Sequence, residues 1–124
     1  MKQPPFFRSL RHAVDGICYA VRSQRNARRQ LVIGAIAVIF GVVVGLDATR
    51  WAILVLAMGA VLATEVMNTA VEAAVDLCTT EVHPLARHAK DAAAGAVLCA
   101  SLTAILVGLC LFGPWLWQQL SQFT

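Results

Sequence analysis

Four polar side chains in the middle of the chain have residue types and a spacing that could do chemistry. They are Glu65, Asn68, Glu72 and Asp76, within the stretch TEVMNTAVEAAVDL at residues 64–77. On an α-helix these positions fall within about 80° of one another, so they form a single polar stripe. Three carboxylates and one amide cannot satisfy each other's hydrogen bonds. The stripe therefore calls for a divalent metal, a bound proton or a donor from elsewhere.

The stripe lies in a chain whose composition is that of a membrane protein. Of its 124 residues, 59% are hydrophobic and only 14% are charged. The apolar run that starts at Trp51 ends at Ala63, which is too short to cross a hydrocarbon core of about 30 Å. The crossing must then include Glu65. Ionisable residues at that depth normally face a protein interior or a wet cavity and have a function, although a purely structural interhelical network remains the alternative.

The whole chain, residues 1–124, is expected to be one all-α membrane domain. We expect an amphipathic surface helix at about 6–29 and three transmembrane spans at about 30–47, 51–73 and 92–114.

Positive residues predict the orientation. Seven of the ten Lys and Arg residues precede the first span, and two more follow the second. The amino terminus and the second loop are therefore expected in the cytoplasm. The basic amino-terminal arm is interpreted as lying on anionic lipid rather than binding nucleic acid.

A second polar cluster follows on the cytoplasmic side, in EVHPLARHAKDAAAGAV at residues 81–97. Pro84 is expected to open the helix that becomes the third span. Lys90 and Asp91 then enter the membrane at a depth similar to that of the acidic stripe. A lysine charge beside carboxylates able to hold Mg²⁺ suits a polyphosphate. The combination predicts phosphoryl transfer, in which catalysis is mostly positioning and charge neutralisation.

Gln24 departs from the pattern of the surface helix. At about 100° per residue it falls on the apolar face, in line with Phe6 and Ile17. A polar side chain that is turned inward needs a partner. A structural contact between helices is one explanation, and a place in the site is the other.

Two motifs give the chain a specific resemblance. The segments EVMNTAVEAAVD at 65–76 and AKDAAAGAVL at 89–98 resemble the signature of the prokaryotic integral-membrane lipid kinases. That family comprises diacylglycerol kinase and undecaprenol kinase, and the similarity runs from about residue 7 to 112. It implies an enzyme of membrane lipid metabolism in the bacterial cytoplasmic (inner) membrane. It also implies a homotrimer with active sites built between subunits, which uses ATP and Mg²⁺ to phosphorylate a lipid hydroxyl.

The resemblance also implies roles for individual residues. Glu65 resembles the catalytic base that takes the proton of the lipid hydroxyl, and Asn68 the amide beside it in the substrate site. Glu72 resembles the carboxylate that holds the magnesium of bound ATP. The remaining nucleotide contacts carried over from the family are Glu81, His83, Lys90 and Asp91. Asp76 matches a recurrent acid without an assigned role.

One position departs from the family. The usual motif is close to S-E-R-N, with a second metal-binding carboxylate, whereas this chain reads S-Q-R-N and has Gln24 there. A glutamine oxygen can bind Mg²⁺ or its water without contributing negative charge. Gln24 is thus a tentative metal ligand. A weakened or non-catalytic homologue that serves as a lipid-binding membrane subunit stays open as an alternative, as does a membrane protein that handles protons or ions.

Overall fold

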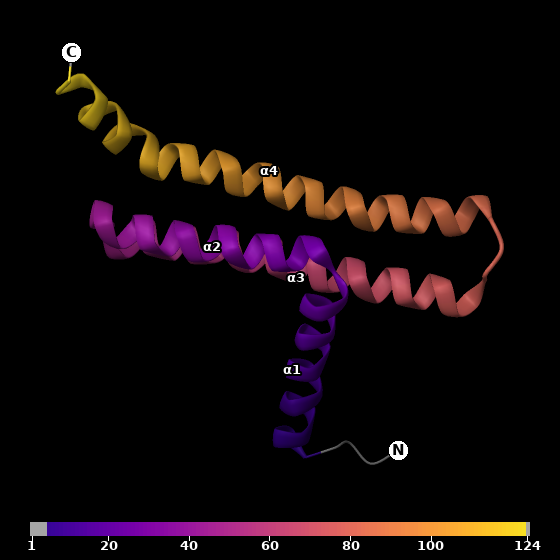
Figure 1. The fold of residues 1–124 in the computed structure, drawn as a ribbon. Helices are drawn as coiled ribbons and strands as arrows, with labels where there is room; N and C mark the ends of the chain where they lie inside the picture. The colour runs from indigo at the N-terminus through magenta and orange to yellow at the C-terminus, as the bar shows by residue number, and fades with distance from the viewer. Residues whose placement is uncertain (1–4, 124) are drawn as a thin grey trace.

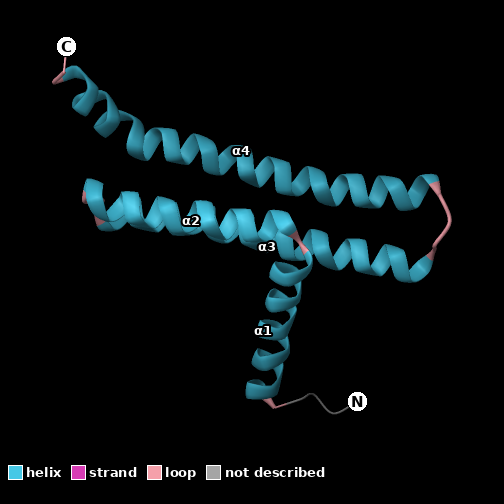
Figure 2. Ribbon diagram, viewed as in Figure 1, coloured by secondary structure: helices cyan, strands magenta, loops and turns pink. Residues whose placement is uncertain are grey.

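The protein is an all-α chain of four helices. The computed structural model describes residues 5–123, which form α1 (Phe6–Ser23), α2 (Arg25–Val44), α3 (Ala48–Cys78) and α4 (Pro84–Ser121). Helices α3 and α4 make a long antiparallel hairpin, α2 runs beside α3, and α1 leaves this bundle crosswise (Figure 1). Figure 2 shows only helices and connecting loops in the described part of the chain. The predicted all-α fold is confirmed.

Three of the helices are suited to cross a membrane. The helices α2, α3 and α4 are each long and apolar enough to do so. Their outer faces expose large apolar side chains, among them Ile36, Leu56 and Leu106, which are 55%, 75% and 63% exposed. Such a surface is matched to lipid, and helices satisfy their own backbone hydrogen bonds there. The chain is therefore a multi-pass membrane protein, with α1 as its shorter, amphipathic helix.

The surface helix is shorter than the sequence predicts. We expected it to continue to residue 29, but the backbone turns extended at Gln24, with φ −108° and ψ 121°, and α2 begins at Arg25. Side chains on both sides close the break. The Ser23 hydroxyl donates to the Tyr19 carbonyl at 2.8 Å, and the Arg28 guanidinium donates to the Arg22 carbonyl at 2.7 Å. The bond to Arg22 satisfies a carbonyl that a continuing helix would have used, whereas the Ser23 bond lies within the last turn of α1. We call this α1–α2 junction the elbow.

The other helix ends follow ordinary capping chemistry. α2 ends at Val44 and is capped by Gly45, which has φ +73°, and the Leu46 amide donates back to the Gly41 carbonyl at 3.1 Å. Asp47 caps α3 by accepting from the Arg50 amide at 2.9 Å. Pro84 opens α4 as predicted. Helices α3 and α4 are longer than the predicted transmembrane spans 51–73 and 92–114. Each helix continues into polar sequence beyond its apolar run.

The apolar core lies at the end of the bundle away from the elbow. Leu46, Leu54 and Leu111 are buried there, and partly buried neighbours include Trp51. Gly41 allows this packing, because a Cβ at that position would lie 2.7 Å from the Trp51 ring. Near this end α4 contains Pro114, and Figure 1 shows the last part of the helix bending away. Apolar packing thus fixes one end of the hairpin and leaves the other for polar groups.

Candidate active site

The polar stripe on α3 passes from the protein interior to water. Glu65 is 2% exposed and Thr69 is 4% exposed, Asn68 and Glu72 are half-buried, and Asp76 is exposed. Burial therefore falls along the stripe toward the hairpin tip. A single helix face presents a desolvated carboxylate at one end and a hydrated one at the other.

The elbow places Gln24 against this stripe. The Gln24 side-chain amide donates to Glu72 Oε2 at 2.8 Å, and Asn68 Nδ2 donates to Glu72 Oε1 at 3.1 Å. Each oxygen of the Glu72 carboxylate thus accepts from one amide, which fixes its orientation. The expectation that Gln24 turns inward to a partner is confirmed. The contact joins residues 48 positions apart and ties the elbow to α3.

Small side chains let the elbow approach α3 closely. Ala20 in α1 is 1% exposed and Ala27 in α2 is 0% exposed, and they flank Gln24 on either side of the break. Because both alanines are buried, a larger side chain at either position would disturb the packing around the elbow. The local sequence AVRSQRNA therefore brings the amide to its partner.

Two buried acceptors in this region have no donor. Within residues 5–123, Glu65 Oε1 and Asn68 Oδ1 are buried and lack a hydrogen-bond partner. The neighbouring hydroxyl does not supply one, because Thr69 Oγ1 donates to the backbone carbonyl of Glu65 at 2.9 Å. A buried acceptor without a donor costs about 1–3 kcal/mol. Both oxygens are therefore free to accept hydrogen bonds from a group outside this chain. We call Gln24, Glu65, Asn68, Thr69 and Glu72 the elbow cluster.

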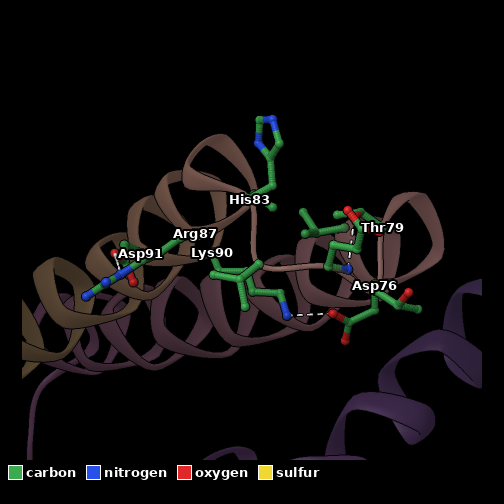
Figure 3. Close-up of a pocket in the computed structure, with 11 residues that line it drawn as sticks. Asp76, Thr79, His83, Arg87, Lys90 and Asp91 are labelled. Carbon is green, nitrogen blue, oxygen red and sulfur yellow. Dashed lines mark hydrogen bonds and ion pairs between the residues drawn. The ribbon is translucent and has the colours of Figure 1, made fainter.

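A second site lies where α3 and α4 meet at the hairpin tip. It is an open groove of about 510 Å³, here called the hairpin groove, between the end of α3 and the start of α4. Figure 3 shows Lys90 of α4 reaching across to Asp76 of α3, while Arg87 lies alongside Asp91 on α4. The charged and imidazole-bearing residues of its lining are Asp76, Glu81, His83, Arg87, Lys90 and Asp91.

The loop of this groove is held by local hydrogen bonds. His83 Nδ1 accepts from the Leu85 amide at 3.1 Å and so caps α4. The Glu81 amide donates to Thr79 Oγ1 at 3.1 Å, and Glu81 itself is exposed. Because Nδ1 is the acceptor, the neutral imidazole of His83 carries its proton on Nε2.

The structure sorts the candidate residues into two groups. Glu65, Asn68, Glu72 and Gln24 gather at the elbow, whereas Glu81, His83, Lys90 and Asp91 line the hairpin groove. Asp76, which had no assigned role, pairs with Lys90. Arg87 was not singled out as a site residue, yet it lines the groove and pairs with Asp91 at 3.6 Å. The sequence could have indicated this pair, because Arg87 stands four residues before Asp91 on a predicted helix, a spacing at which side chains meet.

The chemistry of the donors fits a magnesium ion that is carried mainly by phosphates. In residues 5–123 no three His, Cys, Asp or Glu side chains lie together as a metal site. The elbow cluster instead offers one half-buried carboxylate, Glu72, with two amides around it and an unpartnered Asn68 oxygen. Mg²⁺ takes oxygen ligands and is often bound by one or two carboxylates together with substrate phosphates. Glu72 suits that arrangement.

Comparison with known proteins identifies the family. The sequence pattern of the family described as prokaryotic diacylglycerol kinase matches residues 11–112. The chain belongs to this family. It is 40% identical over 109 residues to an undecaprenol kinase of Bacillus subtilis, covering 88% of this chain and 89% of that protein. It is also 40% identical over 112 residues to a diacylglycerol kinase of Synechocystis, covering 90% of this chain and 64% of that one.

A third relative, a diacylglycerol kinase of Helicobacter pylori, is 30% identical over 92 residues, which are 74% of this chain and 72% of that protein. The predicted resemblance is thereby confirmed, and as a family member the protein is a membrane lipid kinase. The matched residues 11–112 contain both the elbow cluster and the hairpin groove. Membership in a kinase family argues against the alternative of a membrane protein that handles protons or ions. A proton path would also not need the hairpin groove.

Proposed function

We propose that this kinase transfers the γ-phosphate of ATP to the primary hydroxyl of diacylglycerol or undecaprenol, in a reaction that depends on Mg²⁺. The observation that carries the proposal is the buried Glu65 carboxylate, whose Oε1 lacks a donor and which lies about two helical turns from the amide-bound Glu72. A lipid hydroxyl would supply that missing donor. The relatives named above phosphorylate these two lipids by name, and both lipids carry a hydroxyl on an apolar body.

In this mechanism Glu65 acts as the general base. It accepts the proton of the lipid hydroxyl while that oxygen forms a bond to the γ-phosphorus, and the bond from phosphorus to the β-phosphate oxygen breaks. ADP leaves with the electron pair. Burial excludes water that would otherwise compete as acceptor, and Asn68, with its buried oxygen, lines the same substrate site.

Glu72 is proposed to hold the magnesium of the nucleotide. Asn68 fixes the Glu72 carboxylate from one side, and Gln24, a weaker second ligand, lies on the other. Rotation of the Gln24 amide would present its oxygen in place of its NH₂ group. When bound, Mg²⁺ would neutralise charge on the transferring phosphate.

The hairpin groove is proposed to receive the nucleotide. Lys90 and Asp91, with Glu81 and His83 in the loop, are the groups assigned to it. The groove joins the elbow cluster through the stripe, because Asp76 lies one turn beyond Glu72 on α3. That continuity would let the phosphates of a nucleotide in the groove reach Glu72.

We also propose the setting of the enzyme. The distribution of Lys and Arg supports an amino terminus and a hairpin groove in the cytoplasm, in the bacterial inner membrane. A homotrimer with sites between subunits would supply polar partners to the unpartnered acceptors near Glu65. The lipid-exposed apolar faces of α2 to α4 leave room for such packing.

The decisive experiment compares the two lipids with one purified protein. Protein in neutral-detergent micelles receives Mg-ATP with diacylglycerol or with undecaprenol, and transfer of labelled phosphate is followed. We expect turnover on at least one lipid and none without Mg²⁺. Absence of transfer to both lipids would contradict the proposal.

One observation favours a second candidate. Gln24 adds no negative charge beside Glu72, so the metal site has a single carboxylate. The alternative is a weakened or non-catalytic homologue that binds lipid as a membrane subunit. Lipid binding without phosphate transfer in the same micelles would select it.

A further inference from the structure

The two cations of the hairpin groove differ in how firmly they are already paired. Lys90 Nζ contacts Asp76 Oδ1 at hydrogen-bond distance, and the Lys90 side chain is 39% exposed. Arg87 meets Asp91 only through Nε at 3.6 Å, and its side chain is 80% exposed. Within residues 5–123 neither Nη group of Arg87 has a hydrogen-bond partner. Arg87 is therefore the loosely held cation of the pair.

The charge of the groove makes this difference matter. Its described lining contains three acids, Asp76, Glu81 and Asp91, but only two permanent cations, Arg87 and Lys90. Such a groove does not attract a polyphosphate unless a cation can leave its acid. Ion pairs exposed to this extent are worth about 0–1 kcal/mol, so Arg87 can leave Asp91 at little cost. Its planar fork matches phosphate oxygens in a way that a lysine ammonium does not.

We propose that Arg87 is a nucleotide-affinity residue that binds the polyphosphate of the nucleotide through its two free Nη groups. This inference rests on the proposed function of the groove and adds a residue to it. Lys90 keeps its bond to Asp76 until the phosphates are in place, whereas Arg87 makes the first contact. Arg87 thus sets nucleotide affinity, and the lipid side of the reaction does not depend on it.

The test measures nucleotide binding apart from catalysis. A fluorescent ATP analogue is titrated into the purified full-length protein in neutral-detergent micelles that contain no anionic lipid. The variants are Arg87→Ala and Arg87→Lys. The matched control is Arg50→Ala, because Arg50 is also an exposed arginine in a local ion pair, with Asp47 at 3.8 Å, and lies at the other end of α3.

We expect Arg87→Ala to raise the Kd for the analogue about three- to tenfold, with Arg87→Lys in between and Arg50→Ala unchanged. The KM for ATP should rise in parallel, while kcat and the lipid KM stay at wild-type values. The melting temperatures should be equal, since the Arg87 side chain is exposed. An Arg87→Ala protein that binds as Arg50→Ala does would overturn the inference, as would a raised lipid KM, which would place Arg87 against a headgroup. Failure of the wild-type protein to bind the analogue would instead contradict the proposed function.

Discussion

The elbow cluster and the hairpin groove use similar residue types in opposite environments. In the cluster, Glu65 is buried and Glu72 accepts hydrogen bonds from two amides, and among residues 5–123 no lysine or arginine is bonded to either carboxylate. In the groove, Asp76 and Asp91 are exposed and each is paired with a cation. Electrostatic interactions are strong where water is excluded and weak where it is not. The cluster is therefore suited to control the rate of chemistry, and the groove to tune affinity.

The largest expected effect tests the chemical role of the cluster. Glu65→Gln keeps the size of the side chain and removes the proton acceptor, so kcat should fall by about 10²–10⁴-fold with the ATP KM unchanged. Phosphate transfer and thermal unfolding are measured together. The variant should remain folded, because a neutral amide is cheaper to bury than a carboxylate. Near wild-type turnover would remove Glu65 from catalysis.

The next prediction concerns the charge beside Glu72. Gln24→Glu should lower the Mg²⁺ concentration for half-maximal rate by about three- to tenfold, because a second carboxylate joins the first. The lipid KM should not change. Mg²⁺ should also raise the melting temperature of this variant more than that of the wild type.

The matched control is Gln30→Glu, since Gln30 is another half-buried glutamine but bonds Ser101 at 3.3 Å instead of the stripe. That variant should be destabilised with or without Mg²⁺. If Gln24→Glu behaves in the same way, Gln24 is a packing residue and Glu72 acts alone.

An effect of similar size is expected in the groove, but on the KM for ATP and not on the Mg²⁺ dependence. Lys90→Ala should raise the KM for ATP about three- to tenfold, more than the KM for lipid, because it removes a cation from the nucleotide side. Steady-state kinetics with each substrate varied in turn measures both constants, and Lys90→Arg serves as the charge-preserving control. A larger change in the lipid KM would move Lys90 to the lipid side of the site.

The smallest effect compares the two regions in one protein. Raising KCl from about 0.1 M to about 0.5 M should increase the KM for ATP about twofold, because exposed charges are screened. The kcat should stay nearly constant, since the elbow cluster is shielded from the salt. Equal salt sensitivity of both constants would show that the two regions do not differ in this way.

Helical periodicity explains which parts of the site could be predicted. The stripe on α3 and the inward turn of Gln24 both follow from spacing, and the structure joins Gln24 to Glu72. The break at the elbow did not follow, because it depends on Ser23 and Arg28 bonding backbone carbonyls, in a segment without Gly or Pro.

Contacts between α3 and α4 also could not be predicted from the sequence pattern. The pairing of Asp76 with Lys90 depends on how the loop from Thr79 to His83 sets α4 against α3. No periodicity within one helix carries that information. The assigned roles of the site residues remain predictions, whereas the family and the fold class are confirmed.

The length of the hairpin has a consequence for how substrates arrive. At about 1.5 Å per residue, α4 with its 38 residues is about 57 Å long and α3 with its 31 residues about 46 Å, against about 30 Å of hydrocarbon. In the proposed orientation, the part of the surplus at the hairpin tip, at the end of α3 and the start of α4, would carry the groove to the level of the lipid headgroups, because a bilayer with its headgroups is about 40–45 Å thick. A soluble nucleotide would then dock at the membrane surface without entering the hydrocarbon. The lipid approaches sideways within the bilayer, so the two reactants do not compete for the same entrance.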